Sequence, residues 1–235
     1  MRQSLSVTRE TLGRLFFRRC FYLFVTLLAL IALAPFMEAE RGGVFLRYVI
    51  NSVVILAAVA AVGRSILSFL FVLGLAAPAL AFRWLALEQN LPAFVDLALR
   101  FDAAVYATTI ALLLRYVFDK EVLTTDRLWG AAAAYLMIGV LWSFLYAIVE
   151  RASPQSFALH GAPGSMQLIE LLYFSFSTLT TTGFGDIVPL SRPARTAAML
   201  EGIVGQLFLA ILIARLVGVY PQPEPVGAAR VSNLT

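Results

Sequence analysis

Long apolar runs separated by short polar joints account for most of the chain. Four runs occupy the amino-terminal half, at residues 16–36, 47–62, 66–87 and 92–118. The carboxy-terminal half has two more, at residues 128–149 and 196–219, with a shorter apolar stretch between them at 167–180. Most of the long runs approach the roughly 20 residues that cross the hydrocarbon core of a bilayer. The pattern predicts an all-α membrane protein with six transmembrane helices and a short re-entrant helix between the fifth and the sixth.

The polar joints divide this predicted fold into two transmembrane parts. The first four runs form a four-helix part, residues 16–118, and residues 119–126 form a linker along the inner membrane surface. The remaining runs form a second part, residues 127–220. The ends of the chain, 1–15 and 221–235, are predicted to be a cytoplasmic segment and a short cytoplasmic tail.

The orientation rests on the basic residues at the amino terminus. Arg2, Arg9 and Arg14 precede the first apolar run, and such clusters stay on the cytoplasmic side of a membrane. If each predicted helix then crosses the membrane in turn from the cytoplasmic side, the joint between the fifth run and the short helix lies outside the cell. The preference for Arg over Lys suggests a bacterial inner membrane.

Composition supports membrane insertion and argues against several other classes. The chain has 235 residues, of which 60% are hydrophobic and 14% charged, and its mean hydropathy is +0.85, well beyond ordinary soluble usage. Cys20 and His160 are the only residues of their kinds, so we expect no internal disulfide, no metal site and no histidine-dependent enzyme. The basic residues are scattered, which argues against nucleic acid as a partner. Because the predicted tail is short, we expect no soluble regulatory domain in this chain.

One stretch, residues 180–186, combines small and flexible residues in a pattern suited to binding a dehydrated cation. Gly183 and Gly185 permit positive φ at alternate positions, so that successive backbone carbonyls can face a common axis. Rings of such carbonyls can replace the water shell of K⁺. Thr181 adds a carbonyl and a hydroxyl at the inner mouth, and Phe184 can pack its ring behind the stretch.

The short helix at 167–180 leads directly into this stretch. Its carboxyl end would direct the negative end of the helix dipole toward the site, which favours a cation there.

At these residues the chain resembles tetrameric potassium channels, whose signature is Thr-x-Gly-Tyr/Phe-Gly-Asp. Thr182 stands where Val or Ile is more usual, and Phe184 stands where Tyr is commoner and lacks the phenol hydroxyl. The resemblance is specific over residues 127–219, and over 16–118 it concerns only the number and order of helices of the six-transmembrane, one-pore-loop type.

The resemblance implies a role for each residue of a selectivity filter. The ion-binding residues would be Thr181, Thr182, Gly183, Phe184 and Gly185, with K⁺ held at the first four. Support for the filter would come from Thr180, Ser177 and Asp186. K⁺ would be the permeant ion, and no cofactor is expected.

A complete ring of carbonyls needs four such loops, and the chain carries one. The expected assembly is therefore a homotetramer, in which the partners of each chain are three identical subunits, the lipid bilayer and K⁺.

The sixth helix is expected to line the inner cavity. Gln206, Ala210, Ile213 and Val217 fall on one helical face because they are spaced by 4, 3 and 4 residues. Either of the last two would form a hydrophobic constriction that gates the pore.

Two glycines of the sixth helix are candidate hinges. Gly205 follows Gly185 by 20 residues, where the resembled channels often place a hinge, and Gly202 is its rival. Close helix packing is the alternative for both. Glu201 and Arg215 lie nearer the two ends of this helix and are expected at the membrane interfaces.

The fourth run lacks the arginine repeat of a voltage sensor. Its only basic residues are Arg100 and Arg115, whereas a sensor needs several charges at every third position. Asp96 lies four residues before Arg100, on the same helical face, so the two side chains are available to pair. The sequence predicts a potassium-selective channel without strong voltage gating; the alternatives are a non-selective cation channel and a non-conducting subunit with a vestigial pore.

Overall fold

The computed structural model describes residues 19–37, 41–62, 65–89, 91–119 and 124–219, and it is mostly helical, as predicted. The amino-terminal part contains helices α2 (Arg19–Leu33), α3 (Arg41–Val62), α4 (Ile66–Gln89) and α5 (Pro92–Val117), with a short 3₁₀ helix, η1 (Ala34–Met37), after α2. The carboxy-terminal part contains helices α6 (Thr125–Ala152), α7 (Leu168–Leu179) and α8 (Arg192–Val219). The predicted terminal segments, 1–15 and 221–235, lie outside the described residues, as do residues 120–123 of the linker.

Within the described ranges, four helices are long and apolar enough to cross a membrane, namely α4, α5, α6 and α8. The apolar stretches Arg19–Leu33 and Tyr48–Ala61, in α2 and α3, are shorter. The last two long helices both extend beyond their predicted bounds, since α6 begins at Thr125 and α8 begins at Arg192.

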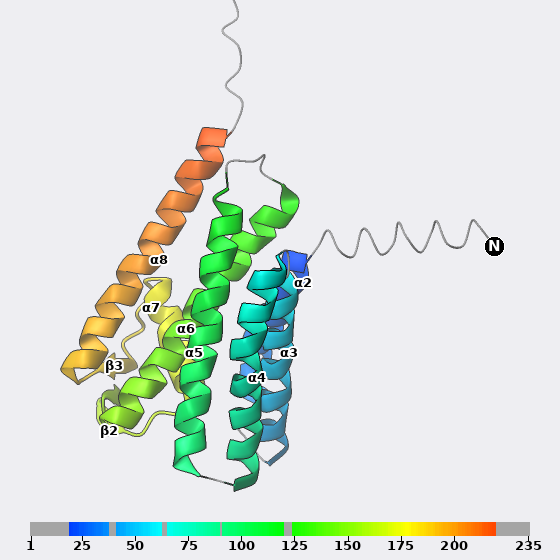
Figure 1. The fold of residues 1–235 in the computed structure, drawn as a ribbon. Helices are drawn as coiled ribbons and strands as arrows, with labels where there is room; N and C mark the ends of the chain where they lie inside the picture. The colour runs from blue at the N-terminus through cyan, green and yellow to red at the C-terminus, as the bar shows by residue number, and fades with distance from the viewer. Residues whose placement is uncertain (1–18, 38–40, 63–64, 90, 120–123, 220–235) are drawn as a thin grey trace, which may run out of the picture.

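The helices form two neighbouring groups joined by α5 and α6 (Figure 1). Helices α2, α3 and α4 lie together, α5 packs on α4 and α6, and α6 also contacts α2, α7 and α8. Helix α8 lies on the far side of α6 from α2–α4 and packs on α6 and α7. Ala131, Ala133 and Ala134 are all buried in α6, and such small residues let neighbouring helices approach closely.

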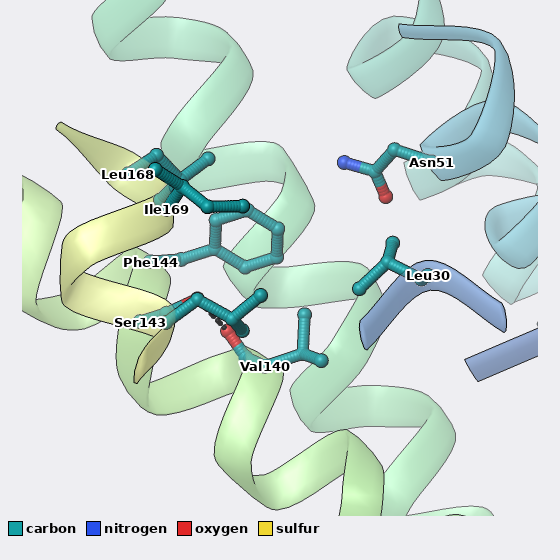
Figure 2. A pocket seen from close by; sticks show the side chains of 8 residues that line it. Leu30, Asn51, Val140, Ser143, Phe144, Leu168 and Ile169 are labelled. Atoms are coloured by element: carbon teal, nitrogen blue, oxygen red, sulfur yellow. Dashed lines mark hydrogen bonds between the residues drawn. The ribbon is translucent and has the colours of Figure 1, made fainter. Parts of the chain in front are cut away.

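The two groups meet along an apolar seam. A cavity of about 40 Å³ lies in this seam, and Figure 2 shows the side chains around it. Its lining comes from four helices and consists of Leu30, Asn51, Val140, Ser143, Phe144, Leu168, Ile169 and Leu172. The short helix α7 therefore faces helices α2 and α3 of its own chain across this cavity, while it packs on α6 and α8.

A small sheet lies beside α7, and the all-α prediction did not include it. Its strands are β1 (Phe157–Leu159), β2 (Ala162–Gly164) and β3 (Ile187–Pro189), in the order β2-β1-β3 with both pairs antiparallel. Strand β1 pairs on both sides because Phe157 lies opposite Gly164 in one ladder and Pro189 in the other. The sheet joins the segment before α7 to the segment after residue 186.

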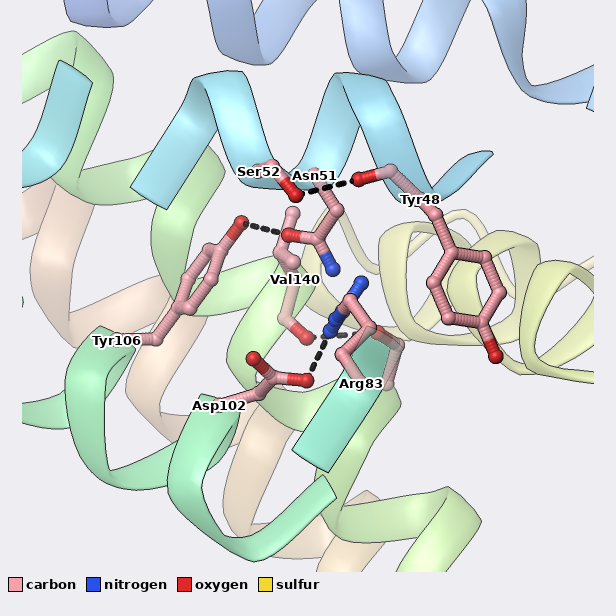
Figure 3. A network of polar contacts seen from close by, with 8 residues as sticks. Tyr48, Asn51, Ser52, Arg83, Asp102, Tyr106 and Val140 are labelled. Atoms are coloured by element: carbon pink, nitrogen blue, oxygen red, sulfur yellow. Dashed lines mark hydrogen bonds and ion pairs between the residues drawn. The ribbon is translucent and has the colours of Figure 1, made fainter. Parts of the chain in front are cut away.

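The charged residues inside the four-helix part form different pairs from the one the sequence suggested. Arg83 of α4 donates a hydrogen bond to Asp102 of α5 (Figure 3), and both side chains are buried. Asp96 pairs with Arg151 at the end of α6. The expected pair of Asp96 with Arg100 is therefore replaced by contacts between different helices.

Candidate functional site

Helix α7 begins at a capping box that fixes where the chain turns toward the site. The backbone N–H of Gln167 donates to the Glu170 carboxylate at 2.6 Å, and the Gln167 side chain caps the first turn in return. Such reciprocal bonds satisfy amides that a helix start leaves without partners. Leu171 and Phe174 are buried on the inner side of the helix. The helix ends at Leu179, so its carboxyl end lies directly before residues 180–186.

The backbone of residues 181–185 alternates between left-handed and ordinary conformations. The φ angles of Thr181, Gly183 and Gly185 are 57°, 55° and 78°. The two glycines meet the expectation from sequence, but Thr181 adopts positive φ as well, which is uncommon for a residue with a side chain. A Cβ at Gly183 or Gly185 would meet no atom within 4 Å. Backbone conformation, rather than lack of space, therefore favours glycine at these two positions.

The end of α7 holds this unusual backbone. The carbonyl oxygen of Ser177 accepts from the N–H groups of Thr182 and Gly183 at 2.9 and 3.0 Å, and the carbonyl of Thr178 accepts from the N–H of Thr181 at 2.9 Å. The Ser177 hydroxyl donates to the carbonyl of Phe174 within the helix. Ser177 thus supports the stretch through its main chain.

Hydroxyl groups gather at the inner end of the stretch. The Thr180 and Thr182 hydroxyl oxygens are 2.9 Å apart, and the Thr181 hydroxyl donates to the carbonyl of Thr180 at 2.7 Å. Gln206 of α8 donates through Nε2 to the Thr181 hydroxyl oxygen at 3.1 Å. The structure therefore brings Gln206, predicted to line the pore, to the inner mouth of the predicted filter.

The outer end is held by an aromatic residue of α7. The ring of Phe184 stacks on Tyr173 with centroids 6.0 Å apart and planes inclined by 9°. The nearby Tyr173 hydroxyl favours the ionised form of the Asp186 carboxyl group and so holds the pKa of Asp186 below its ordinary value. Asp186 also accepts from the backbone N–H of Ile187 at 3.0 Å, and its carbonyl accepts from the N–H of His160 at 2.7 Å. Tyr173 therefore supplies the phenol that Phe184 lacks, and the small sheet fixes the outer end.

The two candidate hinge glycines of α8 lie in different surroundings. A Cβ at Gly205 would clash with the backbone carbonyl oxygen of Leu179 and lie 3.0 Å from its Cδ1, whereas a Cβ at Gly202 would meet nothing within 4 Å. Gly205 therefore lets α8 pack directly on the end of α7, which favours the packing interpretation for this residue.

The other predicted pore-lining residues are exposed along α8. Ala210, Ile213 and Val217 all lie on the surface of the single chain. Arg215 donates to the carbonyl of Asp119 and lies 5.0 Å from the centre of the Phe118 ring. Arg215 thus ties α8 to the end of α5.

Glu201, expected at a membrane interface, has a side chain that is fully buried inside the chain. Helix α8 starts at Arg192 rather than at 196. At a rise of 1.5 Å per residue, Glu201 therefore lies about 14 Å from the start of the helix, measured along its axis. It accepts a hydrogen bond from Tyr146 of α6 and contacts the Ser175 hydroxyl of α7. An acidic residue well inside an apolar helix was the available signal for a buried site.

Within the described ranges, no three His, Cys, Asp or Glu side chains come together as a metal site would require. The chemistry offered by residues 180–186 is instead that of backbone carbonyls and threonine hydroxyls.

Comparison with known proteins finds sequence similarity in the carboxy-terminal part of the chain. Residues 128–220 match the sequence model of a family described as ion channel. The inward rectifier potassium channel Kirbac3.1 of Paramagnetospirillum magnetotacticum is 27% identical over 93 residues, covering 38% of this chain and 28% of the channel. Protein LctB of Bacillus caldotenax is 28% identical over 99 residues, covering 40% of this chain and 73% of LctB.

No solved structure matches the chain. The part of the chain that contains α6, α7, the 180–186 stretch and α8 is therefore similar in sequence to ion channels, and the apolar helices around it are those of a membrane protein.

Proposed function

We propose that the protein is a potassium-selective channel and that residues 180–186 line its pore. The observation that carries the proposal is the alternation of φ at Thr181, Gly183 and Gly185. Alternating conformations turn successive carbonyl groups toward the same side of the chain, and rings of carbonyls replace the hydration shell of K⁺. The carbonyls of Thr181, Thr182, Gly183 and Phe184 bind the ion in this proposal, and no cofactor takes part.

The site is incomplete in one chain, which supports assembly into a homotetramer. Residues 180–185 are exposed in the single chain, although a selective filter has to enclose its ion. Large apolar side chains of α8, including Leu207 and Ile211, are exposed beside them. Four copies around an axis would close the ring and cover part of this face. A native mass measured in mild detergent tests the assembly, and a mass of two chains would contradict it.

The proposed channel responds weakly to voltage. Arg100 and Arg115 of α5 are both exposed on the surface of the chain, whereas sensor charges move through the interior of their helix bundle. Ile213 or Val217 of α8 forms the inner constriction. Both termini lie in the cytoplasm and the channel resides in a bacterial inner membrane, an orientation supported by the amino-terminal arginines.

Flux measurements on liposomes that contain the purified protein test the function. Gly183→Ala places a side chain on a residue with φ of 55°, and Gly161→Ala does the same at φ of 82° in the outer turn between β1 and β2. We expect K⁺ flux to exceed Na⁺ flux, to vanish in Gly183→Ala and to persist in Gly161→Ala. Equal K⁺ and Na⁺ fluxes would favour a non-selective channel. A wild-type protein without flux would favour a vestigial pore.

A further inference from the structure

Glu201 is a fully buried carboxyl group that the proposed conduction path does not use. It lies on α8 and reaches the place where α6 and α7 meet. The Tyr146 hydroxyl of α6 bonds its Oε2, and the Ser175 hydroxyl of α7 lies 2.5 Å from its Oε1. The same Ser175 hydroxyl lies 2.7 Å from the backbone carbonyl oxygen of Gly139 on α6. One acid therefore joins all three helices around the filter.

The number of hydrogens in this cluster favours a proton on Glu201. Both contacts of the Ser175 oxygen have the length of O–H···O hydrogen bonds. A hydroxyl group has one hydrogen, and the Gly139 carbonyl has none to give. If Ser175 donates to Gly139, the hydrogen between Ser175 and Glu201 has to come from the carboxyl group. The Tyr146 hydroxyl supplies its own hydrogen to the other carboxyl oxygen.

Among the residues that the structure describes, no positive group lies against Glu201 to favour an ionised carboxylate. The titratable groups that face Glu201 are Tyr146 and Tyr135 of α6, and the facing group on α7 is the neutral hydroxyl of Ser175. A buried carboxylate without a charged partner is costly, and such a group keeps its proton instead. Gly139 makes the close approach possible, because a Cβ there would lie 2.7 Å from the Phe176 ring of α7.

We propose that Glu201 is a positioning residue that acts as a neutral carboxylic acid, clamps α6, α7 and α8 together behind the filter, and makes conduction fall when it ionises at alkaline pH. The inference rests on the proposed function. Ionisation removes the hydrogen between Glu201 and Ser175. Ser175 then has to turn its own hydrogen to the carboxylate, which leaves its oxygen against the Gly139 carbonyl without a hydrogen between them. The end of α7 that holds residues 181–183 moves in response.

Glu201→Gln is the decisive variant because its amide keeps the neutral form at every pH. Its NH₂ group can donate to Ser175 and its carbonyl can accept from Tyr146, as the acid does. We expect K⁺ flux at neutral pH to be kept and the alkaline decline of the wild type to be lost. Asp96→Asn serves as the matched control, since Asp96 is an exposed acid of α5, and it should keep the alkaline decline. A decline that persists in Glu201→Gln overturns the inference.

Infrared difference spectroscopy tests the protonation without relying on conduction. At neutral pH, we expect the carbonyl band of a protonated carboxylic acid in the wild type and its loss in Glu201→Gln. A spectrum without this band overturns the inference even if the protein conducts K⁺. A wild type without K⁺ flux at every pH would contradict the proposed function, while the band would still decide the state of Glu201.

Discussion

The two halves of the molecule bury an acidic residue in different ways. In the four-helix part, Asp102 is 1% exposed and faces Arg83, so that an opposite charge accompanies the acid. In the carboxy-terminal part, Glu201 is fully buried, and its partners among the described residues are the hydroxyl groups of Tyr146 and Ser175. An ion pair keeps both charges inside the protein, whereas a protonated acid leaves no fixed charge. The comparison indicates that a charge is tolerated between α4 and α5 but excluded beside the proposed filter.

The halves also differ in backbone conformation. Among the residues that the structure describes, those with positive φ all lie between Gln155 and Gly185. The described helices of the four-helix part keep ordinary helical conformations. Strained backbone collects at functional sites, where the surrounding structure holds it in place. This asymmetry agrees with the proposed location of the pore.

The largest expected effect is on K⁺ flux, and it should differ between substitutions at the two glycines of α8. Gly205→Ala should abolish K⁺ flux, because its Cβ would clash with the Leu179 carbonyl at the base of the filter and push α8 away from α7. Gly202→Ala should keep near-normal flux, since its Cβ meets nothing within 4 Å. The measurement is K⁺ flux in liposomes at matched protein content. Equal losses in both variants would contradict the packing role of Gly205.

In the four-helix part, we expect a substitution to lower stability strongly and to leave ion selectivity unchanged. Arg83→Met leaves Asp102 buried without its partner, which should cost about 3–5 kcal/mol of unfolding free energy. Combining it with Asp102→Leu should recover most of that cost. Unfolding in detergent measures the stability, and the ratio of K⁺ to Na⁺ flux should stay unchanged. Arg100→Met, at an exposed site, should change stability by about 0.5 kcal/mol or less; a cost as large as that of Arg83→Met would show that loss of positive charge alone is responsible.

Two buried tyrosines allow a smaller, matched comparison between the halves. Tyr146→Phe removes the donor to Glu201, and Tyr106→Phe removes a bond to Asn51 at 3.3 Å. Each should cost about 1 kcal/mol of stability, the usual contribution of one hydrogen bond. Only Tyr146→Phe should alter the alkaline decline of K⁺ flux. A similar change in Tyr106→Phe would indicate a general loosening of the fold rather than an effect through Glu201.

The smallest effect is expected at acid pH, at the outer end of the filter. Tyr173 lowers the pKa of Asp186, so this carboxylate stabilises the fold above its ordinary pKa, and that contribution is lost as pH falls through the lowered value. Tyr173→Phe should raise the pKa of Asp186 and move this loss to higher pH.

Carboxyl titration by NMR measures that pKa shift, and acid inhibition of K⁺ flux should move in the same direction. Tyr22→Phe, at an exposed residue of α2, is the control. An unchanged Asp186 titration in Tyr173→Phe would show that Tyr173 does not lower the pKa of Asp186.

Sequence patterns predicted the features that depend on neighbouring residues. Apolar runs indicated helices because a membrane or a packed core requires continuous apolar length, and the described helices follow those runs. The glycines at 183 and 185 indicated positive φ, because residues without Cβ adopt it readily. The same reasoning missed Thr181, whose backbone N–H is bonded to the end of α7 and whose hydroxyl is bonded to Gln206.

What the sequence determined by itself was the mostly helical fold and the residues of the candidate filter, since both follow from local composition and spacing. The tertiary structure decided the partners of the buried acids. Asp102 meets Arg83 across 19 positions, and Glu201 meets Ser175 and Tyr146 across 26 and 55 positions. It also decided that Gly205 packs against Leu179 and that β3 pairs with β1. These contacts join separate elements, and periodicity along one element contains no information about which other element will lie beside it.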